Sequence, residues 1–218
     1  MKLFVDTGSI KDVEAIAALG ILDGVTTNPS LLAKEAGDYR QILKKICDIV
    51  KGPVSGEVTT TDFAGMMQQG RDIASIDQHM VVKVPLTRDG IRACKALSST
   101  GIRVNVTLVF SAAQALLAAK AGATFVSPFV GRLDDVATNG MDLIREIIDI
   151  YDNYAFATEV LVASCRHPIH VVEAARMGAD IVTCPPALID QLFNHPLTNI
   201  GLEKFLKDWE KAQAVKAS

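Results

Sequence analysis

The chain has 218 residues, of which 49% are apolar, and a formal net charge of −3 at pH 7. This length is enough for one sizeable hydrophobic core. The nearly neutral charge gives no electrostatic reason to expect binding to nucleic acid or to an anionic membrane. No stretch approaches the roughly 18 apolar residues of a membrane span. We therefore expect neither a nucleic-acid partner nor a membrane partner.

The four cysteines are scattered, with no C-x-x-C pair and no spacing typical of metal ligands. They are Cys47, Cys94, Cys165 and Cys184. Free buried thiols in a reducing compartment are the expected state. The first residues, Met1–Asp6, are too short in apolar length for a signal peptide. A cytoplasmic protein without a metal site is expected.

Short apolar runs rich in β-forming residues alternate with longer segments of helical periodicity. The predicted strands are Leu3–Asp6, Gly24–Thr27, Val54–Val58, Met80–Pro85, Arg103–Val109, Thr124–Phe129, Glu159–Ala163 and Asp180–Cys184. The predicted helices are Ser9–Leu19, Ser30–Val50, Thr61–Ile76, Thr87–Ser98, Ser111–Ala121, Met141–Tyr151, Pro168–Met177 and Pro186–Phe193. Several begin with a Ser, Thr or Asp that can cap a helix, and some end at glycine.

Eight strand–helix units in series are the number found in a closed (β/α)8 barrel, the TIM barrel. The alternative is an open doubly wound sheet, but Asp6–Ser9 after the first strand lacks the glycine pattern of a dinucleotide site. We therefore predict an α/β fold with a single (β/α)8 barrel domain over residues 1–218.

An extra amphipathic helix is predicted at 201–214, after the eighth unit. It carries four large apolar residues at helical spacing: Leu202, Phe205, Leu206 and Trp209. The helix is surplus to the barrel, so it packs either across one barrel end or onto another subunit. The pattern alone does not separate these two arrangements.

Lys83 lies within the run Met80–Pro85, which otherwise predicts a fully buried strand. Burying an unpaired ammonium group is costly and favours the neutral amine. A neutral amine is the form that attacks a carbonyl carbon to make a Schiff base. The alternative is a lysine that reaches water at a strand end or pairs with a carboxylate.

Polar residues lie at or near the ends of most of the other predicted strands. They are Asp6, Thr26, Asn28, Glu57, Asn105, Thr107, Ser127, Ser164 and Arg166, and the apolar Phe129 lies two residues after Ser127. The C-terminal ends of barrel strands carry the chemistry of this fold, whereas Val, Ile and Leu fill its interior. The pattern therefore predicts a polar site at one mouth. Thr7, Ser9, Ser30 and Ser111 are instead expected to be loop or helix-cap residues.

A Schiff-base lysine needs a nearby group that moves protons while the carbinolamine forms and loses water. Glu57, on the neighbouring strand, is the best-placed carboxylate. Thr107, on the strand to the other side, could hold a water between itself and Glu57. Asp6 is placed to take a proton from a substrate hydroxyl, as carbon–carbon cleavage requires. Either carboxylate could instead form only a salt bridge to Lys83.

The predicted anion site consists of Arg132, Ser164 and Arg166, which follow the sixth and seventh strands. Arginine forks suit phosphate, and phosphate sites in this fold favour the late strand loops. Arg132 could equally pair with Asp134 or Asp135.

His167 and His170 form an H-x-x-H pattern at a helix start. No third ligand is in view, so a surface or capping role is favoured over metal binding. Cys165, between Ser164 and Arg166, is expected to point outward into packing.

At these residues the sequence resembles the transaldolase family, specifically its small single-barrel subfamily, which also contains fructose-6-phosphate aldolase. The resemblance covers nearly the whole chain. Its most specific segments are Val5–Thr7, Gly24–Ser30, Val82–Pro85, Asn105–Phe110, Val126–Asp135 and Ala163–Arg166.

The resemblance implies that Lys83 forms the Schiff base and that Asp6 is the acid/base at the substrate C4 hydroxyl. It implies further that Glu57 and Thr107 hold the catalytic water and that Asn28 positions substrate or lysine. The implied phosphate ligands are Arg132, Ser164 and Arg166, and other expected substrate contacts are Thr26, Asn105, Ser127 and Phe129. No cofactor or metal is implied.

The family's reaction transfers a dihydroxyacetone unit between sugar phosphates in the pentose phosphate pathway. Sedoheptulose 7-phosphate and glyceraldehyde 3-phosphate give erythrose 4-phosphate and fructose 6-phosphate. Within the subfamily, the aldolase carries glutamine in place of Glu57 and tyrosine in place of Phe129, so both residues match the transferase. A phenol near the Schiff base could help to release free dihydroxyacetone, and Phe129 offers none.

Two alternative functions are fructose-6-phosphate aldolase and, from another class, a non-catalytic sugar-phosphate-binding barrel or assembly scaffold. Family members of this size commonly form decamers, with the C-terminal helix reaching a neighbour. A homo-oligomer is expected on that ground.

Overall fold

The computed structural model describes residues 1–217. Parallel strands pair in sequence order, and β8 returns to pair with β1, which closes the barrel. The strands are β1 (Lys2–Asp6), β2 (Gly24–Thr26), β3 (Val54–Glu57), β4 (Met80–Pro85), β5 (Val104–Val109), β6 (Phe125–Pro128), β7 (Glu159–Val162) and β8 (Ile181–Cys184). The predicted (β/α)8 barrel is confirmed.

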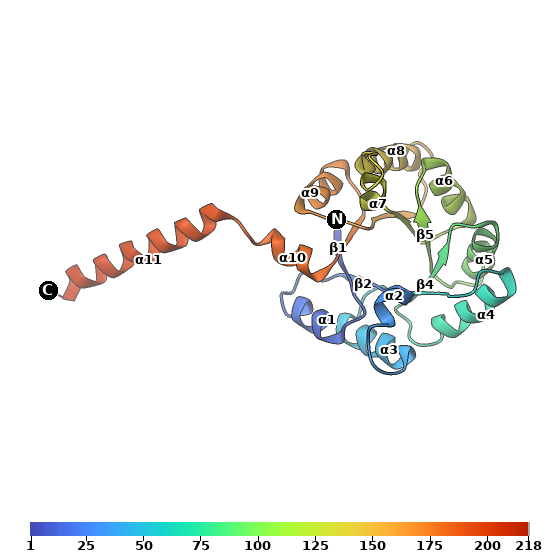
Figure 1. Cartoon of the computed structure of the whole chain (residues 1–218), viewed down its shortest axis with the longest axis horizontal. Coiled ribbons are helices and arrows are strands. Elements are labelled where there is room, and N and C mark those ends of the chain that lie inside the picture. Colours follow the sequence, from blue (N-terminus) through green and yellow to red (C-terminus); the bar gives the residue numbers. More distant parts are fainter. Residues whose placement is uncertain (218) are drawn as a thin grey trace.

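The helices form a ring around these strands, except the last helix, which extends away from it (Figure 1). They are α1 (Ile10–Ala17), α2 (Pro29–Leu32), α3 (Tyr39–Val50), α4 (Phe63–Ala74), α5 (Arg88–Ser98), α6 (Ala112–Ala121), α7 (Val130–Asp134), α8 (Gly140–Asn153), α9 (Pro168–Met177), α10 (Pro186–Leu192) and α11 (Pro196–Ala217). None of the described helices is long and apolar enough to cross a membrane.

Two helices differ in kind from the prediction. The single helix expected at Ser30–Val50 is divided into α2 and α3, because Gly37 adopts φ 117° and Asp38 starts a new helix by accepting a hydrogen bond from the Arg40 N–H. The segment after β6, where no helix was predicted before Met141, contains the short helix α7, which carries Arg132. For the other elements of the barrel, the predicted bounds agree with the observed ones to within two residues.

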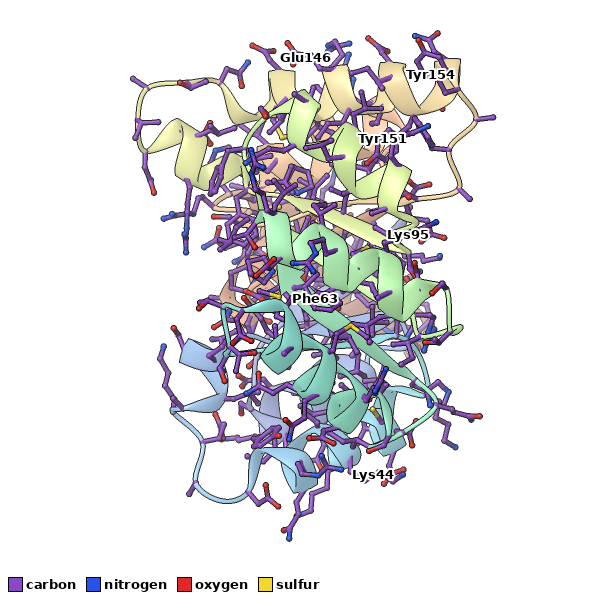
Figure 2. All side chains as sticks on the ribbon, turned by 90° about the vertical axis from the view of Figure 1, so that its right-hand side faces the viewer. Lys44, Phe63, Lys95, Glu146, Tyr151 and Tyr154 are labelled. Atoms are coloured by element: carbon purple, nitrogen blue, oxygen red, sulfur yellow. The ribbon has the colours of Figure 1, made fainter. Side chains whose placement is uncertain are left out.

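The apolar residues form an inner and an outer core. The inner core fills the barrel and contains Phe4, Val81, Phe125, Leu161, Ala163 and Ile181. The larger outer core lies between the sheet and the helices. Helix α8 illustrates the outer layer: the hydroxyl of buried Tyr151 donates to the Ala115 carbonyl of α6 at 2.7 Å, while Glu146 faces outward (Figure 2). Residues of one parity along each strand therefore point into the barrel.

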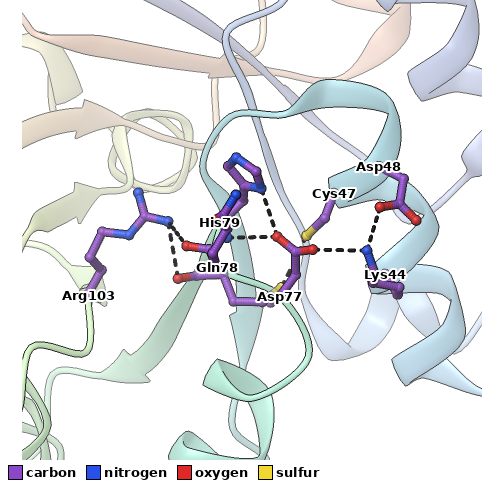
Figure 3. Close-up of polar contacts among 8 residues, drawn as sticks. Lys44, Cys47, Asp48, Asp77, Gln78, His79 and Arg103 are labelled. Atoms are coloured by element: carbon purple, nitrogen blue, oxygen red, sulfur yellow. Dashed lines mark hydrogen bonds and ion pairs between the residues drawn. The ribbon is translucent and has the colours of Figure 1, made fainter.

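The N-terminal ends of β4 and β5 are joined by a polar network around Asp77 (Figure 3). Asp77 accepts hydrogen bonds from the His79 backbone N–H at 2.9 Å and from Lys44 Nζ at 3.0 Å. Arg103 donates to the Gln78 carbonyl at 2.9 Å. The hydrogen bond from the His79 backbone, with those from Lys44 and the His79 ring, lowers the pKa of Asp77 to about 2. This face of a TIM barrel serves stability rather than chemistry.

Helix α11 begins at Pro196, five residues before the predicted start at 201, and extends away from the barrel (Figure 1). It does not pack across a barrel end. Its large apolar side chains are exposed: Leu202 by 58%, Phe205 by 72%, Leu206 by 55% and Trp209 by 63%. Of the two predicted arrangements, packing across the barrel end is excluded for this chain.

Candidate active site

Lys83 points into the barrel from β4, where only 5% of the residue is exposed. The register of β3 and β4 places Glu57 directly beside it. Lys83 Nζ lies 3.0 Å from Glu57 Oε2 and donates to the Thr27 carbonyl at 3.1 Å. The ammonium group is therefore buried but paired, which offsets the cost of removing it from water. The same contact places the Glu57 carboxylate close enough to accept a proton from the Lys83 amine.

Thr107 follows Asn105 on the next strand, whose register places Asn105 beside Lys83. The Thr107 hydroxyl is buried and has no hydrogen-bond partner among the described residues. A buried hydroxyl without a protein partner normally binds water or ligand. The strand is irregular at this point, because its register shifts between Val106 and Val109 and Leu108 adopts φ 59°. Such strain is concentrated at functional sites.

Asp6 ends β1 and faces the same space. Its Oδ1 accepts a hydrogen bond from Thr26 at 2.7 Å, and Thr26 also contacts the Thr183 hydroxyl at 2.7 Å. Burial raises the pKa of the Asp6 carboxyl, while the Thr26 hydrogen bond and the charge of Lys83 oppose the rise. A carboxyl with a raised pKa is suited to gaining and losing a proton during a reaction.

Below Lys83 a line of hydrogen bonds crosses the barrel interior. Ser127 donates to Asn105 Oδ1 at 2.8 Å, and Asn105 Nδ2 donates to Ser55 Oγ at 3.2 Å. Ser55 and Thr183 were not among the predicted site residues. Both could have been found from strand periodicity, because Ser55 lies two residues before Glu57 and Thr183 lies two residues after the inward-facing Ile181.

A cavity of about 350 Å³ opens at the C-terminal ends of the strands. Nine of the predicted residues line it: Asp6, Thr26, Asn28, Lys83, Ser127, Phe129, Arg132, Ser164 and Arg166. Asn105 and Thr107 are buried and do not line it. Glu57 lies on the far side of Lys83 and borders a second cavity of about 480 Å³. The Lys83–Glu57 pair therefore separates two cavities.

Asn28 has a local structural role in addition to its place at the cavity. It is the N-cap of α2, where its Oδ1 accepts the Leu31 N–H at 3.0 Å. This bond fixes the side chain and leaves its amide nitrogen free to donate to a ligand.

The cationic side of the cavity is formed by α7 and by the segment after β7. The Arg132 guanidinium stacks on the Phe129 ring, 5.1 Å from its centroid. It forms no ion pair with Asp134 or Asp135 within the described part of the chain. Asp135 pairs instead with Arg166, whose Nη2 lies 2.7 Å from Asp135 Oδ2. This pairing was not predicted, and of the two arginines it leaves Arg132 without a carboxylate partner among the described residues.

The segment after β7 agrees with one prediction and corrects part of another. Cys165 is packed in the outer core beside the site, as expected, and borders the cavity. A hydrogen bond with Cys184, together with burial, raises the pKa of the Cys165 thiol, so this group is protonated and unreactive. His170 is 3% exposed, so of the two predicted roles the surface one is wrong. Its Nδ1 accepts the Arg166 N–H at the helix start, which fits the capping role, and its Nε2 lies 2.9 Å from Asp134 Oδ2. Helix α9 carries its side chain inward, against α7.

The comparisons with known proteins agree over nearly the whole chain. The family model described as Transaldolase/Fructose-6-phosphate aldolase matches residues 3–216. A protein named probable transaldolase from Nitrosopumilus maritimus is 57% identical over 215 residues, covering 98% of this chain and 97% of that protein. One with the same name from Sinorhizobium medicae is 59% identical over 211 residues, covering 97% of each chain. The chain therefore belongs to the transaldolase/fructose-6-phosphate aldolase family.

Proposed function

We propose that this protein is a transaldolase that moves a dihydroxyacetone unit between sugar phosphates through a Schiff base on Lys83. The observation that carries the proposal is the buried Lys83 amine, 3.0 Å from Glu57 and beside a cavity that is lined by Phe129. Paired lysine and carboxylate groups of this kind supply both the nucleophile and the proton acceptor of Schiff-base chemistry.

The first steps use Lys83, Glu57 and Thr107. Lys83 gives a proton to Glu57, and the neutral amine attacks the ketose C2 carbonyl to form a carbinolamine. Glu57 returns the proton to the carbinolamine oxygen, which leaves as water, and an iminium ion remains. The unpartnered Thr107 hydroxyl supports the proposal that this water is held between Thr107 and Glu57.

Asp6 then acts on the C4 hydroxyl. Its carboxylate accepts the hydroxyl proton as the C3–C4 bond breaks, and the bonding electrons move to the iminium nitrogen to give an enamine. The aldose product leaves with the former C4 as its aldehyde carbon. When the acceptor aldehyde enters, the steps run in reverse, and Asp6 returns its proton to the new hydroxyl. The raised pKa of Asp6 supports this exchange, because a carboxyl that holds its proton more tightly can return it to the new hydroxyl.

Phe129 favours transfer over release of free dihydroxyacetone. Release requires a proton at C3 of the enamine and water at the iminium carbon, and a phenol at the mouth would be a suitable proton donor. No tyrosine lines this cavity among the described residues. The enamine is therefore proposed to persist until an acceptor aldehyde arrives. Fructose-6-phosphate aldolase remains the second candidate, because the same lysine serves both reactions.

Arg132, Ser164 and Arg166 are proposed to bind the substrate phosphate at the edge of the cavity that they line. The exposed apolar side chains of α11 support a homo-oligomer in which this helix packs on a neighbouring copy. The cysteines are free thiols in the structure, which is consistent with the proposed cytoplasmic location.

The test is an assay with fructose 6-phosphate, with and without erythrose 4-phosphate. A transaldolase forms sedoheptulose 7-phosphate only when the acceptor is present and releases little dihydroxyacetone without it. Rapid release of dihydroxyacetone without acceptor would favour the aldolase. Binding of fructose 6-phosphate with neither product, unaltered in K83A, would favour the non-catalytic barrel.

A further inference from the structure

Helix α7 and the segment after β7 lie against each other with no space between them. The Gly131 N–H donates to the Ser164 carbonyl at 3.1 Å, and the Val130 N–H donates to the Ala163 carbonyl at 3.1 Å. A β-carbon on Gly131 would collide with the Ser164 carbonyl and with the Arg166 side chain. Ser164 itself adopts φ 61°, a left-handed conformation that a serine keeps only when its surroundings enforce it.

His170 lies at the junction of these two elements and contacts both. Its Nδ1 accepts the Arg166 backbone N–H at 3.1 Å, and its Nε2 lies 2.9 Å from Asp134 Oδ2. The other Asp134 oxygen accepts the Gly140 N–H at 2.9 Å, at the start of α8. One imidazole ring therefore connects the backbone of Arg166 to the helix that carries Arg132.

These two contacts define the protonation of the ring. Nδ1 faces an N–H donor and must present a lone pair, so Nε2 carries the proton and donates it to Asp134. Burial, with the neighbouring charge of His167, lowers the pKa of His170, while Asp134 and Glu173 oppose this change. The neutral ring with its proton on Nε2 satisfies both partners.

The same assignment argues against a metal site here. Asp134, His167 and His170 hold possible ligand atoms within 4.8 Å of one another. A metal on Nε2 of His170 would require the ring proton to sit on Nδ1, where it would face the Arg166 N–H. Both Asp134 oxygens already accept hydrogen bonds from the protein. His170 and Asp134 therefore serve as hydrogen-bonding groups between α7 and the segment after β7, not as metal ligands.

We propose that His170 is a positioning residue for the phosphate side of the active site, holding Ser164 and Arg166 in fixed relation to Arg132. This inference rests on the proposed function, because it assigns a phosphate to the cavity edge. His170 itself does not line the cavity. Its loss would release the Arg166 N–H and loosen α7, which weakens recognition of the phosphate while leaving Lys83 intact.

The test compares two ligands that react at the same lysine. Borohydride reduction traps the Lys83 adduct of dihydroxyacetone, which has no phosphate, and that of fructose 6-phosphate, which has one. In H170L, the fructose 6-phosphate concentration for half-maximal trapping should rise about tenfold, the order expected from losing a hydrogen bond that fixes a charged site. Half-maximal trapping with dihydroxyacetone should change less than about twofold.

Two further variants make the test specific. In H170N the amide oxygen can replace Nδ1 as acceptor for the Arg166 N–H. This variant should therefore recover part of the affinity for fructose 6-phosphate that H170L loses. If H170L fails to fold, H170N becomes the measured variant, with a smaller rise in the same direction. H195N is the control, because exposed His195 precedes α11 and its Nδ1 accepts the Leu197 N–H rather than a group of α7 or of the segment after β7. Its trapping curves should match the wild type.

Equal shifts for both ligands, or no shift for either in a folded H170L, would overturn the proposed role. Wild-type protein that traps neither ligand would refute the Schiff-base function instead. In that case an NMR titration with inorganic phosphate still tests the positioning role, because it needs no turnover. Wild type should bind phosphate more tightly than H170L, and equal binding would overturn the inference.

Discussion

Replacing Asp6 with Asn separates its chemistry from its effect on stability. Asparagine has nearly the same shape, and its Oδ1 can keep the 2.7 Å hydrogen bond from Thr26. The variant lacks only the charge and the ability to exchange a proton. Because a positioned acid/base contributes roughly 10²–10⁴ in rate, carbon–carbon cleavage should slow by that factor. Trapping of dihydroxyacetone on Lys83 should persist, since that step does not use Asp6.

Although D6N should slow the reaction, it should increase the stability of the fold at high pH. Burial raises the pKa of Asp6 above the value of 3.8 expected in the unfolded chain, so the folded protein holds its proton to higher pH. Stability that comes from this group is present at low pH and is lost as pH rises from about 3.8 through the folded pKa. D6N lacks this loss and should be more stable than wild type at pH 8, with a difference that shrinks toward pH 4.

Urea denaturation across this pH range and rapid-quench cleavage of fructose 6-phosphate measure the two effects. D38N is the matched control, because Asp38 is an exposed N-cap and asparagine caps a helix equally well. The control should change neither property. A D6N protein that is less stable at pH 8, or that cleaves at the wild-type rate, would refute the assignment of Asp6 as a buried acid/base.

Three further predictions concern other parts of the barrel. T107V removes a buried hydroxyl that has no protein partner, so the free energy of unfolding should rise by about 1 kcal/mol. Formation of the Lys83 adduct should slow about 100-fold. A destabilised variant with normal trapping would contradict this prediction. F129Y should raise dihydroxyacetone release relative to transfer, measured with and without erythrose 4-phosphate, and an unchanged ratio would disprove the role of Phe129. Because the pKa of Asp77 is lowered to about 2, wild-type stability should fall from about pH 4 to pH 2, and acid titration of D77N should lack this component.

The barrel was predictable because each strand and each helix has its own periodicity. Met80–Pro85 was predicted with its observed bounds, since an apolar run ending in proline has few alternatives. The break between α2 and α3 was missed, although Gly37 followed by the capping residue Asp38 is a recognisable helix start. Helix α7 spans only five residues and its N-cap residue makes no side-chain hydrogen bond, so no local pattern indicates it.

The neighbours of Lys83 followed only in part from strand order: Glu57 lies directly beside it on β3, whereas its partner on β5 is Asn105, two residues before the predicted Thr107. The ion pairs on the cationic side of the cavity could not be predicted from the sequence. Whether Asp134 or Asp135 pairs with Arg132 or Arg166 depends on how α7 packs against the segment after β7. That packing is a tertiary contact, and no spacing in the chain specifies it.

The central claim is that Lys83 carries the reacting carbon chain, and borohydride reduction in the presence of fructose 6-phosphate tests it most directly. Mass spectrometry of the digested protein should find a reduced three-carbon adduct on the peptide that contains Lys83, and K83A should show none. An unmodified Lys83 under conditions that support turnover would contradict the Schiff-base mechanism.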